Sequence, residues 1–67
     1  MNLYTFRELE LKSGEFIYLV NERGEGFSGI YEGEYDNANE TFKFNNSSNG
    51  IIETIYIENL QVLQRMY

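Results

Sequence analysis

The residues of this chain that could do chemistry are carboxylates, and several of them come in close pairs. Glu22 and Glu25 form one pair, and Glu32 and Glu34 form another. Two carboxylic acids can hydrolyse a glycoside when a cleft raises the pKa of one of them. Glu32 and Glu34 instead share the outer side of one predicted strand, where acidic side chains are normally solvated. We therefore predict no catalytic residues.

Other kinds of chemistry are limited by what the 67 residues leave out. The chain has no His and no Cys, which excludes disulfides, thiolate nucleophiles, imidazole bases and the common zinc sites. Residues 36–40 (DNANE) offer oxygen atoms as a calcium loop does, but Ala38 stands at the third position, where an oxygen ligand is required. We expect no metal, no cofactor and no enzymatic activity.

A glycine motif needs a separate interpretation. Residues 24–29 (GEGFSG) fit the pattern G-x-G-x-x-G. A phosphate-binding loop of this type must join a strand to a helix, whose N-terminal amides face the phosphate. Here the alternating pattern continues through Tyr35, so the motif joins two strands, and Glu25 would repel phosphate. A kinase-type glycine loop needs a lysine strand and a far larger domain. The glycines are predicted to shape turns and bends.

The element before these strands is a short helix, predicted over residues 5–12. Thr5 and Glu8 fit a capping box, Phe6 and Leu9 recur at helical spacing, and Gly14 can end the segment. The alternation within residues 8–12 leaves a strand as the competing interpretation.

Five strands are predicted within residues 15–66. They cover residues 16–20, 26–35, 40–45, 51–58 and 60–66, with turns at 21–25 and 36–39 and a polar loop at 45–50. The second strand carries aromatic residues and glycines on one face: Phe27, Gly29, Tyr31, Gly33 and Tyr35. Glycines inside a strand mark bends and bulges that can curl a small sheet. We predict a mainly β single domain over residues 1–67, a small five-stranded barrel with a short N-terminal helix.

The layout resembles the Sm fold, and especially the bacterial Sm-like RNA chaperones, over about residues 5–64. Residues 18–21 (YLVN), 27–29 (FSG) and 35–37 (YDN) are similar to that family's first strand, bent glycine strand and Asp-containing turn. Residues 55–58 (IYIE) fall where those chaperones carry a Tyr-Lys-His signature, with Ile57 and Glu58 in place of Lys and His. The resemblance implies RNA or single-stranded nucleic-acid binding by a homo-oligomeric ring. The residues involved would be Tyr35, Asp36, Asn37, Asn39 and Tyr56.

The charge pattern favours a different partner. The net charge is −6, and the acids concentrate between residues 22 and 40, opposed there only by Arg23. Such a segment repels a phosphate backbone and attracts a basic surface. A solvated face that keeps the protein soluble is the simpler alternative. We predict a basic protein partner and no membrane. The predicted partner-binding residues are Glu22, Glu25, Tyr31, Glu32, Glu34, Tyr35, Asp36 and Glu40.

Size and composition suggest the setting in which such a module works. A domain of this length buries only about 60% of its unfolded surface, so self-association is the expected route to extra stability. The longest apolar run is residues 16–20, too short for a membrane span, and a cytoplasmic protein is predicted. Abundant Asn, Ile, Tyr and Phe fit the AT-rich genome of a low-GC bacterium or its virus.

The predicted function is a regulator or inhibitor that occupies the basic surface of a nucleic-acid-binding protein. A small-molecule pocket between subunits remains a third interpretation.

Overall fold

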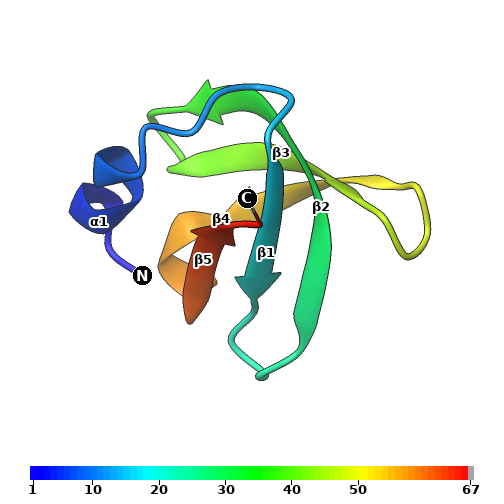
Figure 1. Cartoon of the computed structure of the whole chain (residues 1–67). Helices are drawn as coiled ribbons and strands as arrows, with labels where there is room; N and C mark the ends of the chain where they lie inside the picture. The colour runs from blue at the N-terminus through cyan, green and yellow to red at the C-terminus, as the bar shows by residue number, and fades with distance from the viewer. Residues whose placement is uncertain (67) are drawn as a thin grey trace.

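The chain folds into one bent sheet with a short helix beside it (Figure 1). The computed structural model describes residues 1–66. The elements are α1 (Leu3–Glu8), β1 (Phe16–Val20), β2 (Gly26–Asp36), β3 (Thr41–Asn46), β4 (Ile52–Tyr56), the 3-10 helix η1 (Ile57–Asn59) and β5 (Val62–Arg65). The strands lie in the order β4-β3-β2-β1-β5, and all neighbours are antiparallel. The predicted mainly β class with a short N-terminal helix is confirmed.

The helix begins and ends earlier than predicted. The side chain of Asn2, not Thr5, caps it: the Asn2 Oδ1 accepts a hydrogen bond from the backbone N–H of Thr5 at 2.8 Å. Asn is at least as good an N-cap as Thr. Asn2 therefore caps the helix, three residues before the predicted cap at Thr5. The helix stops at Glu8, because Leu9 forms its C-cap and Glu10 has a positive φ of 49°. The predicted helix over residues 5–12 is therefore wrong in its bounds.

Apolar side chains gather on the inner face of the sheet. Antiparallel partners share a face, and the register pairs Leu19 with Phe27 and Tyr31 with Phe44. This confirms that Phe27, Gly29 and Tyr31 point to the same side. The buried core consists of Phe6, Ile17, Leu19, Tyr31, Phe42, Phe44, Ile57, Leu60 and Leu63.

Strand β2 is one long curved ribbon, as predicted (Figure 1). A Cβ placed on Gly29 would lie 2.1 Å from the backbone oxygen of Asn45, so only glycine allows the two strands to approach here. Gly33 has a φ of 82°, and the β2–β3 register shifts on both sides of it. This is a β-bulge, which bends the strand and interrupts its alternation. The geometry of the strand therefore accounts for both glycines.

The C-terminal half differs in detail from the predicted strands. Thr41, predicted to point outward, is buried, and Asn46 belongs to β3 rather than to a loop. Strand β4 ends at Tyr56, because residues 57–59 form the 3-10 helix η1, which buries Ile57. Strand β5 is correspondingly shorter than predicted.

Strands β4 and β5 form the two edges of the sheet, and within residues 1–66 they do not pair with each other. No helix in this described part of the chain has the length and apolar character needed to cross a membrane.

Candidate functional site

Aromatic rings fill the region of the core that α1 covers. Phe6 stacks on Phe42 with ring centroids 5.5 Å apart and on Tyr35 at 5.8 Å, and Tyr31 lies 5.1 Å from Phe42. Tyr31 is only 6% exposed. Burial disfavours its phenolate and raises the pKa of Tyr31. Tyr31, predicted as a partner-binding residue, has its ring in the core and exposes little surface to a partner.

The polar turn between β2 and β3 brings four of the predicted nucleic-acid residues together. Asp36 accepts hydrogen bonds from the side chain of Asn39 at 2.9 Å and from the backbone N–H groups of Ala38 and Asn39. These bonds, led by the one from the Asn39 side chain, lower the pKa of Asp36. Asn37 accepts bonds from Arg7 at 3.2 Å and from the Tyr35 hydroxyl at 3.4 Å. The amide and carboxylate groups are thus used mainly to hold the turn itself.

The predicted acidic residues do not form one continuous patch. Glu22 and Glu25 lie in the β1–β2 hairpin, where both are exposed. Glu32, Glu34 and Asp36 lie in the second half of β2, and Glu40 lies in the turn that follows it. That strand has 11 residues, which at about 3.3 Å each separates its ends by roughly 30 Å along the chain. The acidic residues that are close in the sequence therefore form two groups in space. Glu22 and Glu25 lie just before the start of β2, and the others lie toward or just beyond its end.

The β1–β2 hairpin is held by a compact network around Asn21. Its backbone N–H donates to the oxygen of Glu25 at 2.9 Å. Its side-chain Oδ1 accepts from the N–H groups of Arg23 and Glu25, and its amide donates to the Glu25 carboxylate at 2.9 Å. The turn that carries Glu22 and Arg23 is therefore firmly shaped, although both side chains are exposed.

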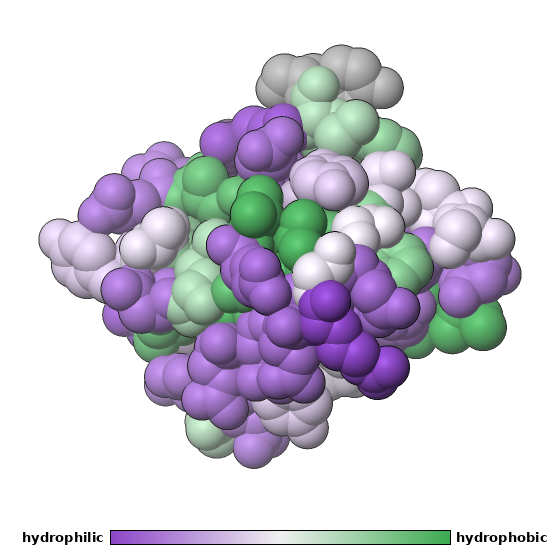
Figure 2. All heavy atoms as spheres, turned by 90° about the horizontal axis from the view of Figure 1, so that it is seen from below, coloured by the Kyte–Doolittle hydropathy of each residue, from purple (hydrophilic) through white to green (hydrophobic). Residues whose placement is uncertain are grey.

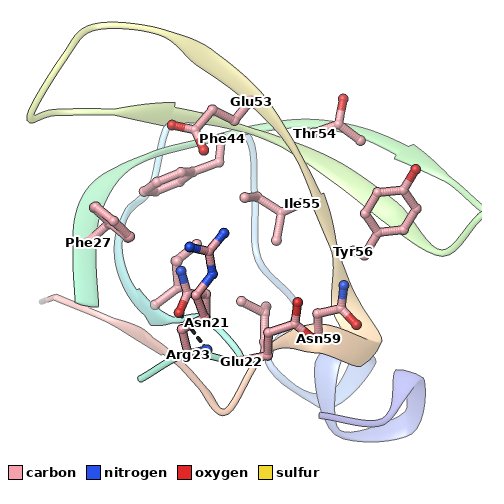
Figure 3. Close-up of a pocket in the computed structure, with 12 residues that line it drawn as sticks. Asn21, Glu22, Arg23, Phe27, Phe44, Glu53, Thr54, Ile55, Tyr56 and Asn59 are labelled. Carbon is pink, nitrogen blue, oxygen red and sulfur yellow. Dashed lines mark hydrogen bonds between the residues drawn. The ribbon is translucent and has the colours of Figure 1, made fainter. Parts of the chain in front are cut away.

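A pocket opens between this hairpin and the free edge of β4 (Figure 3). Its volume is about 170 Å³, below the roughly 300–1,000 Å³ of pockets that take drug-sized ligands, so it suits one side chain better than a cofactor. The walls are Leu19, Phe27, Phe44, Ile55 and Leu60, and the polar rim is Asn21, Glu22, Arg23, Glu53, Thr54, Tyr56 and Asn59. We refer to it as the hairpin pocket. Viewed from below, apolar side chains reach the surface among hydrophilic ones (Figure 2).

Glu53 places a carboxylate on the otherwise apolar inner face of the sheet, beside this pocket. It pairs with Phe44 in the β3–β4 register and, like Ile55, it is half-buried while Ile52, Thr54 and Tyr56 are exposed. Its carboxylate accepts a hydrogen bond from the buried amide of Asn46 at 3.1 Å. Our sequence reasoning missed Glu53. The signal was present, because Glu53 has the same parity as Ile55 in an alternating strand.

Arg23 extends from the hairpin into the pocket, between Phe27 and Phe44 on one side and Ile55 on the other (Figure 3). Within residues 1–66 its guanidinium takes part in no ion pair or hydrogen bond; the ion pair there joins Arg65 to Glu15. Glu22 and Glu53 also line the pocket, so the charges around it are two negative and one positive.

Tyr56 lies at the rim with half of its surface exposed, and its strand neighbour in β3 is Thr41. Thr41 in turn pairs with Asp36, so the sheet brings Tyr56 within two strands of the β2–β3 turn. Among residues 1–66 no group of acidic side chains is arranged to hold a metal ion.

Comparison of the chain with protein-family models, with curated proteins and with solved structures finds no match.

Proposed function

We propose that this chain is a non-enzymatic, cytoplasmic binding module that engages a basic protein partner through the hairpin pocket. The supporting observation is the pocket itself, where the Glu22 and Glu53 carboxylates flank a hollow with aromatic walls. Apolar walls supply binding free energy on burial, and carboxylates at their edge select a cationic group. Tyr56 at the rim presents a half-exposed ring, the residue type that most often anchors protein interfaces.

The acids at the other end of β2 would act over a longer range. Glu34 is exposed, and Glu32, Asp36 and Glu40 are half-buried near it. Their field, with Glu25, would raise the rate at which a basic partner arrives without forming the contact. A partner that normally grips nucleic acid would thereby have its basic surface occupied, which would make this chain an inhibitor or regulator of that protein.

The fold behind this module is, in our proposal, a small SH3/Sm-like barrel. Three features support it: the strand order β4-β3-β2-β1-β5, the bend of β2 at Gly33, and the single 3-10 turn that joins β4 to β5. We also propose self-association. Apolar side chains are exposed on or beside the two edge strands, at Ile51, Ile52, Tyr56, Val62 and Met66.

A binding assay with defined probes tests the proposed function. A labelled nine-residue oligo-arginine peptide and a labelled oligo-uridine RNA are titrated with the protein in fluorescence anisotropy, at low and at physiological salt. We expect the peptide to bind and the RNA to show no binding. The triple variant E32Q/E34Q/D36N should slow association and leave dissociation nearly unchanged, whereas E22Q/E53Q should speed dissociation. Equal binding by all variants would contradict the proposal.

The alternative function is Sm-like binding of RNA or single-stranded nucleic acid by a ring. It is supported by the grouping of Tyr35, Asp36, Asn37 and Asn39 in one turn, with Tyr56 two strands away. Free edges on β4 and β5 are also suited to pairing between copies. Binding of the RNA probe with an affinity that falls steeply as salt rises, and no binding of the peptide, would favour this function.

A further inference from the structure

A guanidinium group, that of Arg23, already lines the hairpin pocket (Figure 3). The side chain reaches the pocket from a turn whose backbone is fixed by the Asn21 network. Its guanidinium forms no ion pair with residues 1–66, although Glu22 and Glu53 line the same pocket. Arg23 is exposed rather than buried, so water competes for it and it can leave the pocket at small cost.

The chemistry of the walls matches the same group. A planar guanidinium is weakly hydrated and stacks well on aromatic faces, and here the half-buried ring of Phe27 provides such a face, with the buried Phe44 behind it. Without Arg23, the charged groups that line the pocket would be two carboxylates, Glu22 and Glu53. The pocket is thus apolar in its walls and negative at its rim.

The edge of β4 provides a second element of recognition. This strand pairs with β3 on one side only, so within residues 1–66 no strand pairs with its other edge. The pocket is lined in part by β4 residues Glu53, Thr54, Ile55 and Tyr56. An extended segment laid along this edge would hydrogen-bond to the β4 backbone and bring one of its side chains to the pocket.

We propose that the hairpin pocket binds the side chain of an arginine in an extended segment of the partner, and that Arg23 is an internal stand-in which this arginine displaces. The inference rests on the proposed function, since it requires a basic partner. It adds the side chain that is recognised and a competitor within the chain itself. Because Arg23 lines the pocket in the free protein, the apparent affinity for the partner is reduced by the fraction of molecules in which its guanidinium takes the place of the partner's arginine.

The test uses short peptides that carry a single charged residue. An acetylated and amidated pentapeptide with a central arginine and Gly and Ser elsewhere is compared with its lysine and citrulline versions. Binding is followed by amide chemical-shift changes in the ¹⁵N-labelled protein, which also shows that each variant is folded. The arginine peptide should shift the amides of the hairpin and of β4, and the citrulline peptide, which is neutral, should not.

Three variants separate the roles of the pocket residues. Removing the stand-in with R23A should tighten arginine-peptide binding about threefold or more. E22Q/E53Q should weaken it by about tenfold, since two charge interactions are lost. The control E8Q/E58Q removes the same net charge from residues outside the pocket and should change binding less than twofold.

The outcomes distinguish this inference from the proposed function. Weaker binding to R23A, or peptide-induced shifts confined to the β2–β3 turn, would overturn the inference while oligo-arginine binding kept the proposed function intact. Failure of both the pentapeptide and the oligo-arginine peptide to bind would overturn both.

Discussion

Two regions of the inner face of the sheet differ in whether the helix α1 covers them. In the helix-covered region, the Phe6 ring from α1 lies over Tyr31, Tyr35 and Phe42, and the aromatic residues there become core. In the hairpin pocket, Phe27 lies on the same face, but no helix within residues 1–66 covers it, and its half-buried ring lines an opening above the buried Phe44. Similar side chains are therefore structural in one region and available in the other.

The two regions differ because residues 1–66 contain only one short α-helix with which to cover the sheet. A helix of 6 residues supplies one buried side chain, Phe6, and this is enough for one region only. A domain of about this size leaves a larger fraction of its surface exposed than a longer one does. The uncovered part is where the sheet carries a carboxylate, Glu53, on its inner face. Whether an aromatic residue is core or binding surface is thus decided by what lies on top of it.

The largest contrast is expected between Phe42→Ala and Phe27→Ala. Phe42 is fully buried beneath Phe6, so its truncation should lower the free energy of unfolding by about 3–5 kcal/mol, enough to unfold much of the population. Phe27 is half-buried at the pocket and should cost about 1–2 kcal/mol, since less apolar area is lost. Urea denaturation measures both. Equal losses would break the distinction between the two regions.

Truncating Phe6, the side chain of α1 that covers the aromatic core, should have the next largest effect on the free energy of unfolding. Phe6→Ala takes away the ring that stacks on Phe42 and Tyr35, and we expect a loss of about 2–4 kcal/mol. Tyr4→Ala, on the same helix but exposed, serves as the control and should change stability by less than about 0.5 kcal/mol. Urea denaturation of both variants provides the comparison. A Phe6→Ala protein as stable as the control would mean that α1 covers nothing of importance.

The burial of Tyr31 predicts a loss of stability at alkaline pH. Its pKa is raised in the folded state, so above about pH 10 the unfolded chain loses this proton first and unfolding becomes more favourable. The contribution of the Tyr31 proton to the free energy of unfolding is fully present below about pH 10, and it is lost as the pH rises through the pKa of the folded state. Tyr31→Phe should flatten the fall between pH 9 and 11, measured by urea denaturation at each pH, whereas Tyr56→Phe should leave it unchanged. An identical pH profile for both variants would show that Tyr31 is not protected.

The smallest effect concerns the β2–β3 turn, outside both regions. The side chain of Asn39 is the main cause of the lowered pKa of Asp36, and this carboxylate stabilises the fold at neutral pH and loses that effect as the pH falls below about 4. Asn39→Ala should raise the pKa of Asp36 toward its ordinary value and reduce the acid sensitivity of unfolding. An NMR titration of the Asp36 carboxyl measures the shift. A pKa that does not move would assign the lowering to the backbone N–H groups alone.

Much of the sheet could be predicted from local patterns. Alternation identified β2 and the face shared by Phe27, Gly29 and Tyr31, because a strand determines its two faces residue by residue. The bulge at Gly33 interrupts the pairing with β3, yet Tyr35 beyond it still packs against the core beside Phe6. The helix was misplaced because Asn2 and Thr5 both suit an N-cap, and in the structure the Asn2 side chain forms the cap.

The site was less predictable than the fold. The acidic residues from Glu22 to Glu40 are close in sequence, but an extended β2 carries them to opposite ends of the strand. Tyr31 was predicted as a partner-binding residue beside acidic neighbours, but its ring is buried against Phe42 and against Phe6, 25 residues earlier. The hairpin pocket unites residues 19–27 with residues 53–60, a proximity that exists only after the sheet has bent.

The position of Arg23 in the free protein is the most direct test of this account. The measurement is the nuclear Overhauser effect between the Arg23 δ-methylene protons and the ring protons of Phe27 and Phe44, in protein without any peptide. We predict clear cross-peaks, together with δ-proton shifts displaced by the aromatic ring currents. Arg23 protons with random-coil shifts and no contact to either ring would contradict the claim that the Arg23 side chain lines the pocket.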